Sequence, residues 1–323
     1  MKFMKKQCLS LLALSGLLAG AAVFPVYGAE TTYTVGICQF VQHEALDAAT
    51  NGFKDALLEQ LGDQIIFDEQ NAQGDYSTCT SIINGFVSQD VDLILANATA
   101  SLQAAATATS DIPILGTSVS EYGAALQLDQ FDGTVGGNIS GTSDLAPLDE
   151  QAAVIKELFP NARHIGLLYC SAEPNSQYQI DVVSEELEKL GYTYECYTFS
   201  DSNDISSVTM NAASKCDVIY VPTDNTAASN AELIANVYVP DGIPVVAGEE
   251  NTCMHCGVAS FSIDYYDLGY TTGQMAARVL TGEEDISTMP IEYASNYTKR
   301  YNPEICSQLG IEVPDDYVAL ESK

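Results

Sequence analysis

Positive charge is scarce in this sequence. Of its 323 residues, 12 are Lys or Arg and 44 are Asp or Glu, which gives a formal net charge of −32. Such a chain lacks the basic face that nucleic-acid-binding proteins use to release phosphate counterions. It also lacks the Lys and Arg clusters that dock proteins on anionic lipid. These shortages exclude a generic nucleic-acid binder and argue against docking on anionic lipid.

The acidic composition does not indicate disorder. Charged residues make up only 17% of the chain, whereas 46% of the residues are hydrophobic. That proportion is enough to build a buried core. At roughly 150 residues per domain, the length suggests about two domains.

Recognisable catalytic motifs are also missing. The sequence contains no Walker A motif, no G-x-G-x-x-G and no G-x-S-x-G nucleophile elbow. It has three histidines, and His43-Glu44 lacks the second His of a zincin helix. An enzyme would need a nucleophile and a base at one site, and no such pair is visible. We therefore expect a protein that is not an enzyme and has no cofactor.

The first residues have the layout of a secretory signal. Lys2, Lys5 and Lys6 precede an apolar stretch over 8–24, and small residues follow it. We expect a signal peptide over 1–28, and we favour cleavage over a membrane anchor because the apolar stretch is near the lower limit for spanning a bilayer. Cys8 precedes the apolar stretch and lacks a lipobox, so no lipid anchor is evident.

Eight cysteines remain after this segment. An even number in an exported protein permits disulfides, but several lie in apolar strand-like runs, where cysteine is often a small buried hydrophobe. Both interpretations stay open. Cys253 and Cys256, with His255 between them, could be half a zinc site or a redox pair. No second paired motif supplies the remaining ligands, so a disulfide or buried thiols are favoured and no metal is expected.

Short apolar strands alternate with helical patterns along the whole chain, which is typical of βαβ units and parallel sheets. In the first half we expect strands over 33–40, 65–67, 93–96 and 112–115, and helices over 44–61, 76–87 and 99–109. The pattern restarts after Asp144. There we expect strands over 164–169, 194–199, 218–221, 243–246 and 258–263, and helices over 147–159, 177–190, 205–213, 227–237 and 264–280.

A polar loop of small residues follows each of six strands. Ligands of such sheets bind beyond the carboxyl ends of the strands, and helix N-termini there suit a carboxylate. N-capping alone explains part of the pattern. Two sets of side chains complete a pocket for a zwitterion such as an amino acid. The expected partners of an ammonium group are Asp224, Glu249, Glu250 and Asp264. The aromatic residues that could pack a side chain are Phe40, Tyr122, Tyr265 and Tyr266.

Several segments, in the same order, resemble a known family. They are 35–47, 138–144, 169–176, 221–225 and 262–269. Together they resemble the ABC transporter substrate-binding proteins of the tryptophan/tyrosine type over the whole mature chain. The resemblance implies a type I periplasmic-binding-protein fold, in which two doubly wound parallel-sheet lobes are joined by three crossovers. It implies a first lobe of 31–143 plus 264–289 and a second of 144–263 plus 290–323, with the third crossover near 290–293.

The resemblance also implies roles for individual residues. In the first lobe the ligand would be lined by Gln39, His43, Thr99, Ser118, Ser120 and Glu121. In the second it would be lined by Ser171, Glu173, Asn175, Asp224, Asn225 and Glu250, with Asp264 at the hinge. The sequence departs from the family in lacking the lipobox cysteine that anchors most Gram-positive members.

The function expected from these features is capture of a small amino acid-like solute, with an aromatic amino acid favoured. The lobes would close on it and deliver it to the permease of an ABC importer at the outer face of the cytoplasmic membrane or in the periplasm. The alternatives are a sensor or enzyme domain on the same two-lobed fold, or a binder of another small solute. A receptor would need a transmembrane and signalling segment, and a repressor would need a basic DNA-binding head.

Overall fold

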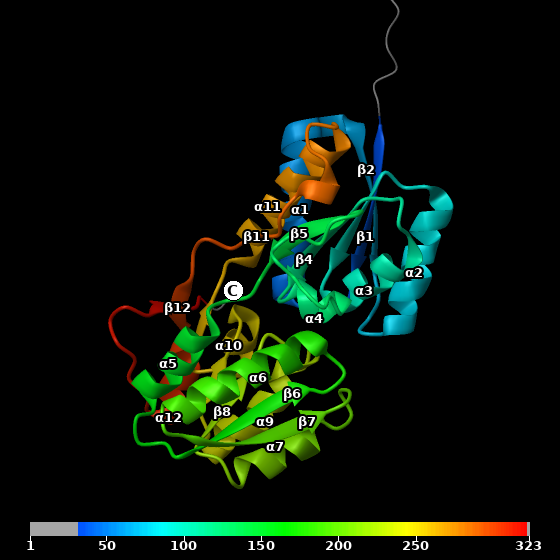
Figure 1. The fold of residues 1–323 in the computed structure, drawn as a ribbon. Coiled ribbons are helices and arrows are strands. Elements are labelled where there is room, and N and C mark those ends of the chain that lie inside the picture. Colours follow the sequence, from blue (N-terminus) through cyan, green and yellow to red (C-terminus); the bar gives the residue numbers. More distant parts are fainter. Residues whose placement is uncertain (1–31, 322–323) are drawn as a thin grey trace, which may run out of the picture. The chain divides into compact units, whose positions relative to one another are not determined.

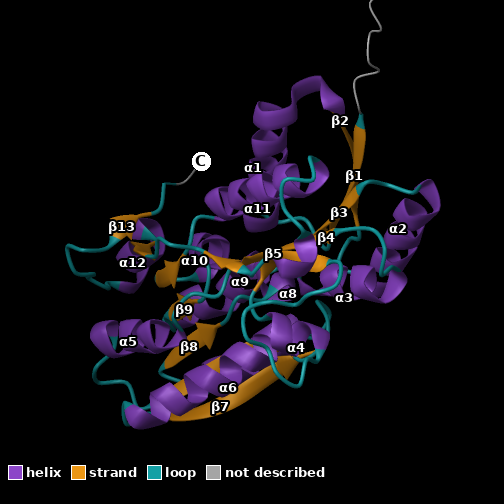
Figure 2. Ribbon diagram, turned by 45° about the horizontal axis from the view of Figure 1, so that its top comes forward, coloured by secondary structure: helices purple, strands orange, loops and turns teal. Residues whose placement is uncertain are grey.

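The structure is a computed structural model, and it describes residues 32–321. The signal peptide expected over 1–28 lies outside the described residues. The described chain forms one unit that contains two β-sheets (Figures 1 and 2). We call the part around the first sheet the first lobe and the part around the second sheet the second lobe.

The first lobe is built on a six-stranded parallel sheet in the order β11-β5-β4-β3-β1-β2. Its strands are β1 (Tyr33–Gln39), β2 (Ile65–Asn71), β3 (Leu93–Asn97), β4 (Ile114–Val119), β5 (Ile139–Ser143) and β11 (Glu292–Tyr293). The central strands are buried along their length. Burial on both faces suits apolar runs such as that of β3, because helices cover both faces of the sheet.

Helices pack on the two faces of the first sheet as two separate apolar clusters. One cluster contains α2 (Tyr76–Gln89) and α3 (Thr99–Ala108), and the other contains α1 (Glu44–Leu61) and α11 (Tyr265–Leu280). The lobe also holds α4 (Tyr122–Leu126) and the short helices η1 (Gly62–Gln64) and η2 (Ile286–Thr288). The expected helix over 44–61 has the observed bounds of α1.

The second lobe is built on a seven-stranded mixed sheet in the order β13-β12-β10-β9-β8-β6-β7. Its strands are β6 (His164–Cys170), β7 (Thr193–Phe199), β8 (Val218–Val221), β9 (Val245–Ala247), β10 (Ala259–Ser262), β12 (Thr298–Tyr301) and β13 (Val318–Ala319). Only the pairing of β10 with β12 is antiparallel.

Apolar helices again cover both faces of this sheet. On one face lie α5 (Leu148–Leu158) and α6 (Pro174–Lys189), and on the other lie α7 (Ile205–Ala213) and α9 (Ala231–Asp241). The lobe is completed by α8 (Asn225–Ala228), α10 (Glu250–Cys256) and α12 (Pro303–Leu309). The single helix expected over 227–237 is in fact the separate helices α8 and α9.

Three segments cross between the lobes: β5 to α5, β10 to α11, and β11 to β12 (Figure 1). The fold class expected from the sequence is therefore confirmed. The third crossover falls later than expected, because Glu292 and Tyr293 pair with Thr142 and Ser143 of β5. The first sheet thus extends past the boundary expected at residue 289, and the crossover follows Tyr293.

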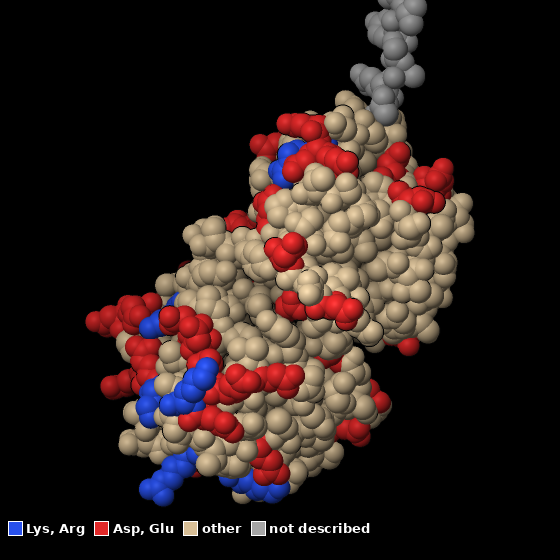
Figure 3. Space-filling view, in the orientation of Figure 1, with Lys and Arg blue, Asp and Glu red and all other residues tan. Residues whose placement is uncertain are grey.

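Acidic side chains are spread over both lobes (Figure 3). On the face shown, Asp and Glu lie over each lobe, whereas Lys and Arg appear at few places, most of them on the second lobe. A strong net charge of one sign keeps a protein soluble. Within residues 32–321, no helix is both long and apolar enough to cross a bilayer.

The eight cysteines within the described range are free thiols, and all except Cys196 are buried. Cys253 and Cys256 lie inside α10, and no group of His, Cys, Asp and Glu in residues 32–321 could hold a metal ion.

In a chain that starts after residue 28, we expect a thiol reagent to modify Cys196 alone in the native state. All eight cysteines should react in denaturant without reductant, and fewer than eight would indicate a disulfide.

Candidate functional site

The carboxyl ends of the parallel strands of both lobes meet across a cleft. Two side-chain contacts in the described chain join the lobes there. His43 Nε2 lies 3.4 Å from Asn225 Oδ1, and Gln179 Nε2 donates to Ser120 Oγ at 3.4 Å. Both contacts are made by residues at the ends of strands or in the helices that follow them, which is where ligands bind in such sheets.

The backbone of the first lobe is strained at this edge. Ala98 has φ 86° and Ser118 has φ 53°, although neither is glycine. Non-glycine residues in this region of φ cost about 1–3 kcal/mol and cluster at functional sites. The two residues are neighbours, because Ala98 N donates to Thr117 O at 3.0 Å.

Helix α3 begins at the strained residue without a cap. Ala98 precedes it and offers no side-chain oxygen to the first amides. In contrast, carboxylates cap α2, α4, α8, α10 and α11. The α3 N-terminus therefore keeps its positive end available to an anion. Beside it, Ser118 Oγ is buried and has no hydrogen-bond partner among residues 32–321.

Asp144 lies against the same strand end. Its backbone N donates to Val119 O at 3.3 Å, and its side chain is 3% exposed. Oδ2 accepts a 2.9 Å hydrogen bond from Tyr265 of the second crossover, whereas Oδ1 is buried and unpartnered within the described chain. Burial raises the pKa of this carboxyl above its ordinary value. A cationic group next to Oδ1 would offset that cost.

The second lobe supplies a network centred on Glu173. Its carboxylate accepts from the backbone and side chain of Asn225 and of Thr226, at 2.7–3.0 Å. Asn175 Nδ2 donates to Thr223 O at 3.0 Å, while Asn175 Oδ1 is buried and finds no partner in the part of the chain described. This network fixes the loops that face the first lobe.

Asp224 belongs to the interior of the second lobe rather than to the cleft surface. It caps α8 and accepts from Cys170 N at 2.7 Å and from Ser176 Oγ at 2.8 Å. Burial, together with the neighbouring Glu173 charge, raises the pKa of Asp224 to about 8. Its observed role is to hold the ends of β6 and β8 together.

A cavity of about 530 Å³ opens between the lobes beside the Glu173 network and Ala100 of α3, whereas Ser118 and Asp144 do not line it. The side chains of Phe40, Tyr76 and Gln103 line it from the first lobe, and Glu173, Asn175 and Asn225 line it from the second. A volume of this size suits a small organic ligand. The three second-lobe residues are among those that the sequence suggested.

Other residues expected at the site make local contacts. Gln39 is buried and bonds to Val41, Asp47 and Thr50, and Thr99 is buried in the first turn of α3. Glu121 caps α4, and Ser171 is exposed and donates to Phe199 O at 3.2 Å. These contacts stabilise the loops around the cleft.

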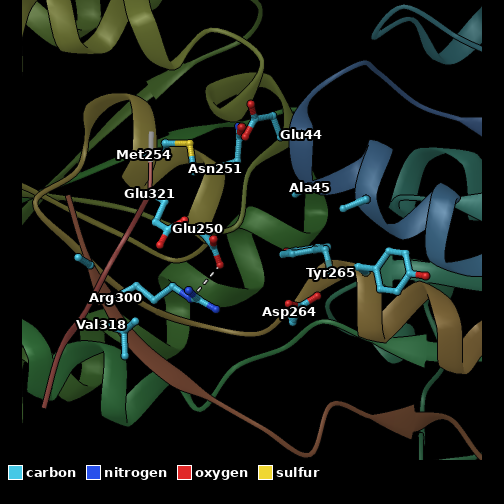
Figure 4. A pocket seen from close by; sticks show the side chains of 13 residues that line it. Glu44, Ala45, Glu250, Asn251, Met254, Asp264, Tyr265, Arg300, Val318 and Glu321 are labelled. Atoms are coloured by element: carbon cyan, nitrogen blue, oxygen red, sulfur yellow. Dashed lines mark ion pairs between the residues drawn. The ribbon is translucent and has the colours of Figure 1, made fainter. Parts of the chain in front are cut away.

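Glu250 and Asp264 line a different pocket of about 430 Å³ (Figure 4). In it Glu250 and Arg300 point toward each other and form an ion pair at 3.0 Å, and Asp264 lies near them. Asp264 is exposed and caps α11 through Asp267 N. Neither residue lines the 530 Å³ cavity.

The groups expected to hold an ammonium ion therefore have other partners. Asp224, Glu249 and Asp264 cap helices, and Glu250 pairs with Arg300. Of the four aromatic candidates, Phe40 lines the cavity. The Tyr122 hydroxyl donates to Thr142 O, that of Tyr265 to Asp144, and that of Tyr266 to Asp55.

Comparison with known proteins decides the family. The family model for ABC transporter substrate binding proteins matches residues 34–323. The chain belongs to this family. Within it, the chain is 38% identical over 263 residues to the tyrosine-binding protein of Clostridioides difficile, and the match covers 80% of this chain and 75% of that one.

Solved structures of substrate-binding proteins show the same type I fold. A Streptococcus pneumoniae ABC domain in complex with L-Trp has a TM-score of 0.84 and 33% identity, covering 88% of this chain and 97% of its own. The ligand-free, open structure of a Clostridium difficile substrate-binding protein with adhesive properties has a TM-score of 0.69 and 37% identity. That match covers 90% of this chain and 100% of the other. In overall structure this binding protein is thus more similar to the L-Trp complex than to the open structure.

Sequence reasoning missed Asp144 and Gln179 as parts of the binding-protein cleft. The sequence presents Asp144 only as the residue after which the pattern of strands and helices restarts, and Gln179 only as part of the helix expected over 177–190. The one available signal for Asp144 is a polar residue three positions before the helix expected over 147–159. Gln179 had none, since helical spacing does not reveal that a side chain faces another lobe.

Proposed function

We propose that this substrate-binding protein captures an aromatic amino acid outside the cytoplasm and delivers it to the permease of an ABC importer. Lobe closure around the ligand is the working step, and no chemical reaction occurs. The observation that carries this proposal is the uncapped N-terminus of α3 and the buried, unpartnered Asp144 Oδ1, which follow β3 and β5 on either side of β4 at one edge of the first sheet.

The α3 N-terminus suits the ligand's carboxylate. Backbone amides at an uncapped helix start donate to anions, and the helix dipole favours negative charge there. Ser118 adds a buried hydroxyl from the next strand along the sheet. A carboxylate at this position would satisfy the Ser118 hydroxyl and the first amides of the helix at once.

Asp144 suits the ligand's ammonium group. Its unpartnered Oδ1 is a buried acceptor, and an ion pair in such an environment is strong when the partner is also hydrogen-bonded. Ser120 lies next to both ends of the site, because it follows Ser118 by two residues and its side chain lowers the pKa of Asp144 by hydrogen bonding. The zwitterion would therefore be held mainly by the first lobe.

The cavity of about 530 Å³ suits an aromatic side chain. Phe40 and Tyr76 line it, and rings of this kind pack on one another by offset or edge-to-face contact. Relatives support the assignment: one is named a tyrosine-binding protein, and another has L-Trp bound.

The proposal is tested by the fluorescence of the ligand itself. The sequence contains no tryptophan, so a blue shift in L-tryptophan emission on adding protein reports the ligand alone. We expect saturable binding of L-tryptophan, competition by L-tyrosine, and an increase in melting temperature with either ligand. Melting shifts with sugars or nucleobases, together with none for any amino acid, would refute the ligand assignment.

Two analogues test separately whether the protein recognises the carboxylate and the ammonium group of the ligand. Tryptamine lacks the carboxylate, and indole-3-propionate lacks the ammonium group. We expect both to compete at least a hundredfold more weakly than L-tryptophan, because each leaves a buried group at the site unpaired. Equal competition by either analogue would show that the corresponding end of the ligand is not recognised.

A further inference from the structure

The hydrogen bond between His43 and Asn225 joins the two lobes. His43 is the residue before α1 in the first lobe, and Asn225 is the first residue of α8 in the second. Their side chains meet at 3.4 Å, between His43 Nε2 and Asn225 Oδ1. Separation of the lobes would break this contact.

The orientation of the Asn225 amide determines which nitrogen of His43 carries hydrogen. Asn225 Nδ2 donates to Glu173 Oε2 at 2.8 Å, so Oδ1 is the atom that faces His43. An amide oxygen only accepts hydrogen bonds, and therefore His43 must donate from Nε2. In the neutral ring Nδ1 then has no hydrogen. It is buried and without a partner in residues 32–321.

A second proton on this ring would be unfavourable in the closed arrangement. It would go to Nδ1, where the described chain offers no acceptor. The ring also sits at the N-terminus of an 18-residue helix, whose dipole disfavours a cation. Burial lowers the pKa of His43 below its ordinary value.

Nearby carboxylates act in the opposite direction without reversing the effect. The hydrogen bond to Asn225 favours a cation at His43, and so do the charges of Glu173 and Asp47. Both carboxylates already accept hydrogen bonds from other residues. Glu44, Glu232 and His255 line a pocket of about 450 Å³ next to the ring. The net direction remains a lowered pKa.

We propose that His43 is a positioning residue that latches the lobes together while its imidazole is neutral and releases them when the ring is protonated. This proposal rests on the proposed function, because protonation of His43 would weaken the capture of the solute in acid. His43 was expected from the sequence to line the ligand; here it acts by holding the second lobe in place.

The direction of the pH dependence follows from linkage. The half-buried ring of His43 becomes more exposed in the open form, and its pKa then returns toward about 6.5. Above that pH the His43 imidazole is neutral in both the open and the closed form, and closure releases no proton. Below it the open form binds a proton that the closed form rejects, so closure releases that proton and affinity falls. The loss approaches tenfold for each pH unit below about 6.5.

The test compares the wild type with His43→Gln. A Gln amide can donate to Asn225 without titrating in this range. We expect the wild-type affinity for L-tryptophan to fall about fivefold between pH 6.5 and 5.5, and that of His43→Gln to fall markedly less. Asp224, with a pKa of about 8, and Glu249, with a pKa of about 7, are common to both proteins. The difference between the profiles therefore isolates His43. His164→Gln, on β6 of the second lobe, is the matched control and should follow the wild type.

If the affinity of His43→Gln depends on pH as that of the wild type does, the proposal that His43 latches the lobes is refuted. If the wild type binds no aromatic amino acid at any pH, the proposed function fails, and the latch is judged by NMR instead. With three histidines in the sequence, each ring can be assigned by substitution. The hydrogen bond to Asn225 by itself raises the pKa of His43, so a higher His43 pKa in Asn225→Ala reports exposure of the ring on lobe opening, and this is the result that we expect. An unaltered His43 titration would overturn the latch.

Discussion

Replacing Asp144 with Asn should remove most of the affinity for the amino acid ligand and leave the ligand-free protein folded. Asn keeps the size of the side chain and an oxygen for Tyr265, but it removes the charge. Deleting one partner of a buried charge pair costs about 2–5 kcal/mol, roughly a 30-fold to several-thousandfold rise in Kd. The measurement is Kd for L-tryptophan at neutral pH.

The ligand-free stability of Asp144→Asn should be equal to or higher than that of the wild type. Because burial raises the folded-state pKa of Asp144, the wild type loses stability as the pH rises above the ordinary carboxyl value. An uncharged amide does not carry this cost. The variant would thus unfold at the wild-type urea concentration or above it, while its melting temperature would rise little on adding ligand.

Asp264→Asn is the control for this experiment. Asp264 also lies at a crossover, but it is exposed and caps α11. Asn is as good an N-cap as Asp, so both affinity and stability should stay near wild type. If Asp144→Asn binds L-tryptophan within about threefold of the wild-type Kd, the loss of binding free energy is less than about 1 kcal/mol. Asp144 would then not contact the ligand.

The fold was predictable because its signals are local. Apolar runs of four to seven residues alternate with helical spacing, and Gly62 ends the expected helix over 44–61 where α1 ends. The missed elements lack such signals. Strand β5 has the sequence ISGTS, with one large apolar residue, and β11 has only two residues. Their pairing depends on neighbouring strands rather than on their own composition.

The site was less predictable, because hydrogen-bond partners decide which polar residues are available. Asp224 and Glu121 follow strands as expected, but their carboxylates cap helices. Ser118 Oγ and Asp144 Oδ1 remain unpartnered within the described residues for reasons that depend on the packing of whole elements. Sequence spacing identifies the loops that form the cleft, and only the three-dimensional arrangement identifies the side chains that face it.

Replacing Gly269 with Val should destabilise the whole protein. Gly269 lies in α11 at a close crossing with α1, where an added Cβ would lie 1.9 Å from Ala49 O. Gly52 and Gly273 make equally close approaches to backbone oxygens, at 2.1 and 2.5 Å from the added Cβ. A backbone oxygen cannot rotate away as a side chain does, so the helices must separate. Overpacking of this kind costs about 1–3 kcal/mol and more where the backbone is rigid.

We therefore expect Gly269→Val to lose about 3 kcal/mol or more of unfolding free energy in urea. The matched control is Gly85→Ala in α2, where an added Cβ meets nothing within 4 Å. Because alanine is the better helix former, that change should be neutral or stabilising by up to about 1 kcal/mol. Helix α1 begins after His43 and α11 begins at the second crossover. Separating the pair would thus also displace His43 and the second crossover, and weaker ligand binding should accompany the lost stability. Wild-type stability in Gly269→Val would mean that the two helices do not cross this closely in solution.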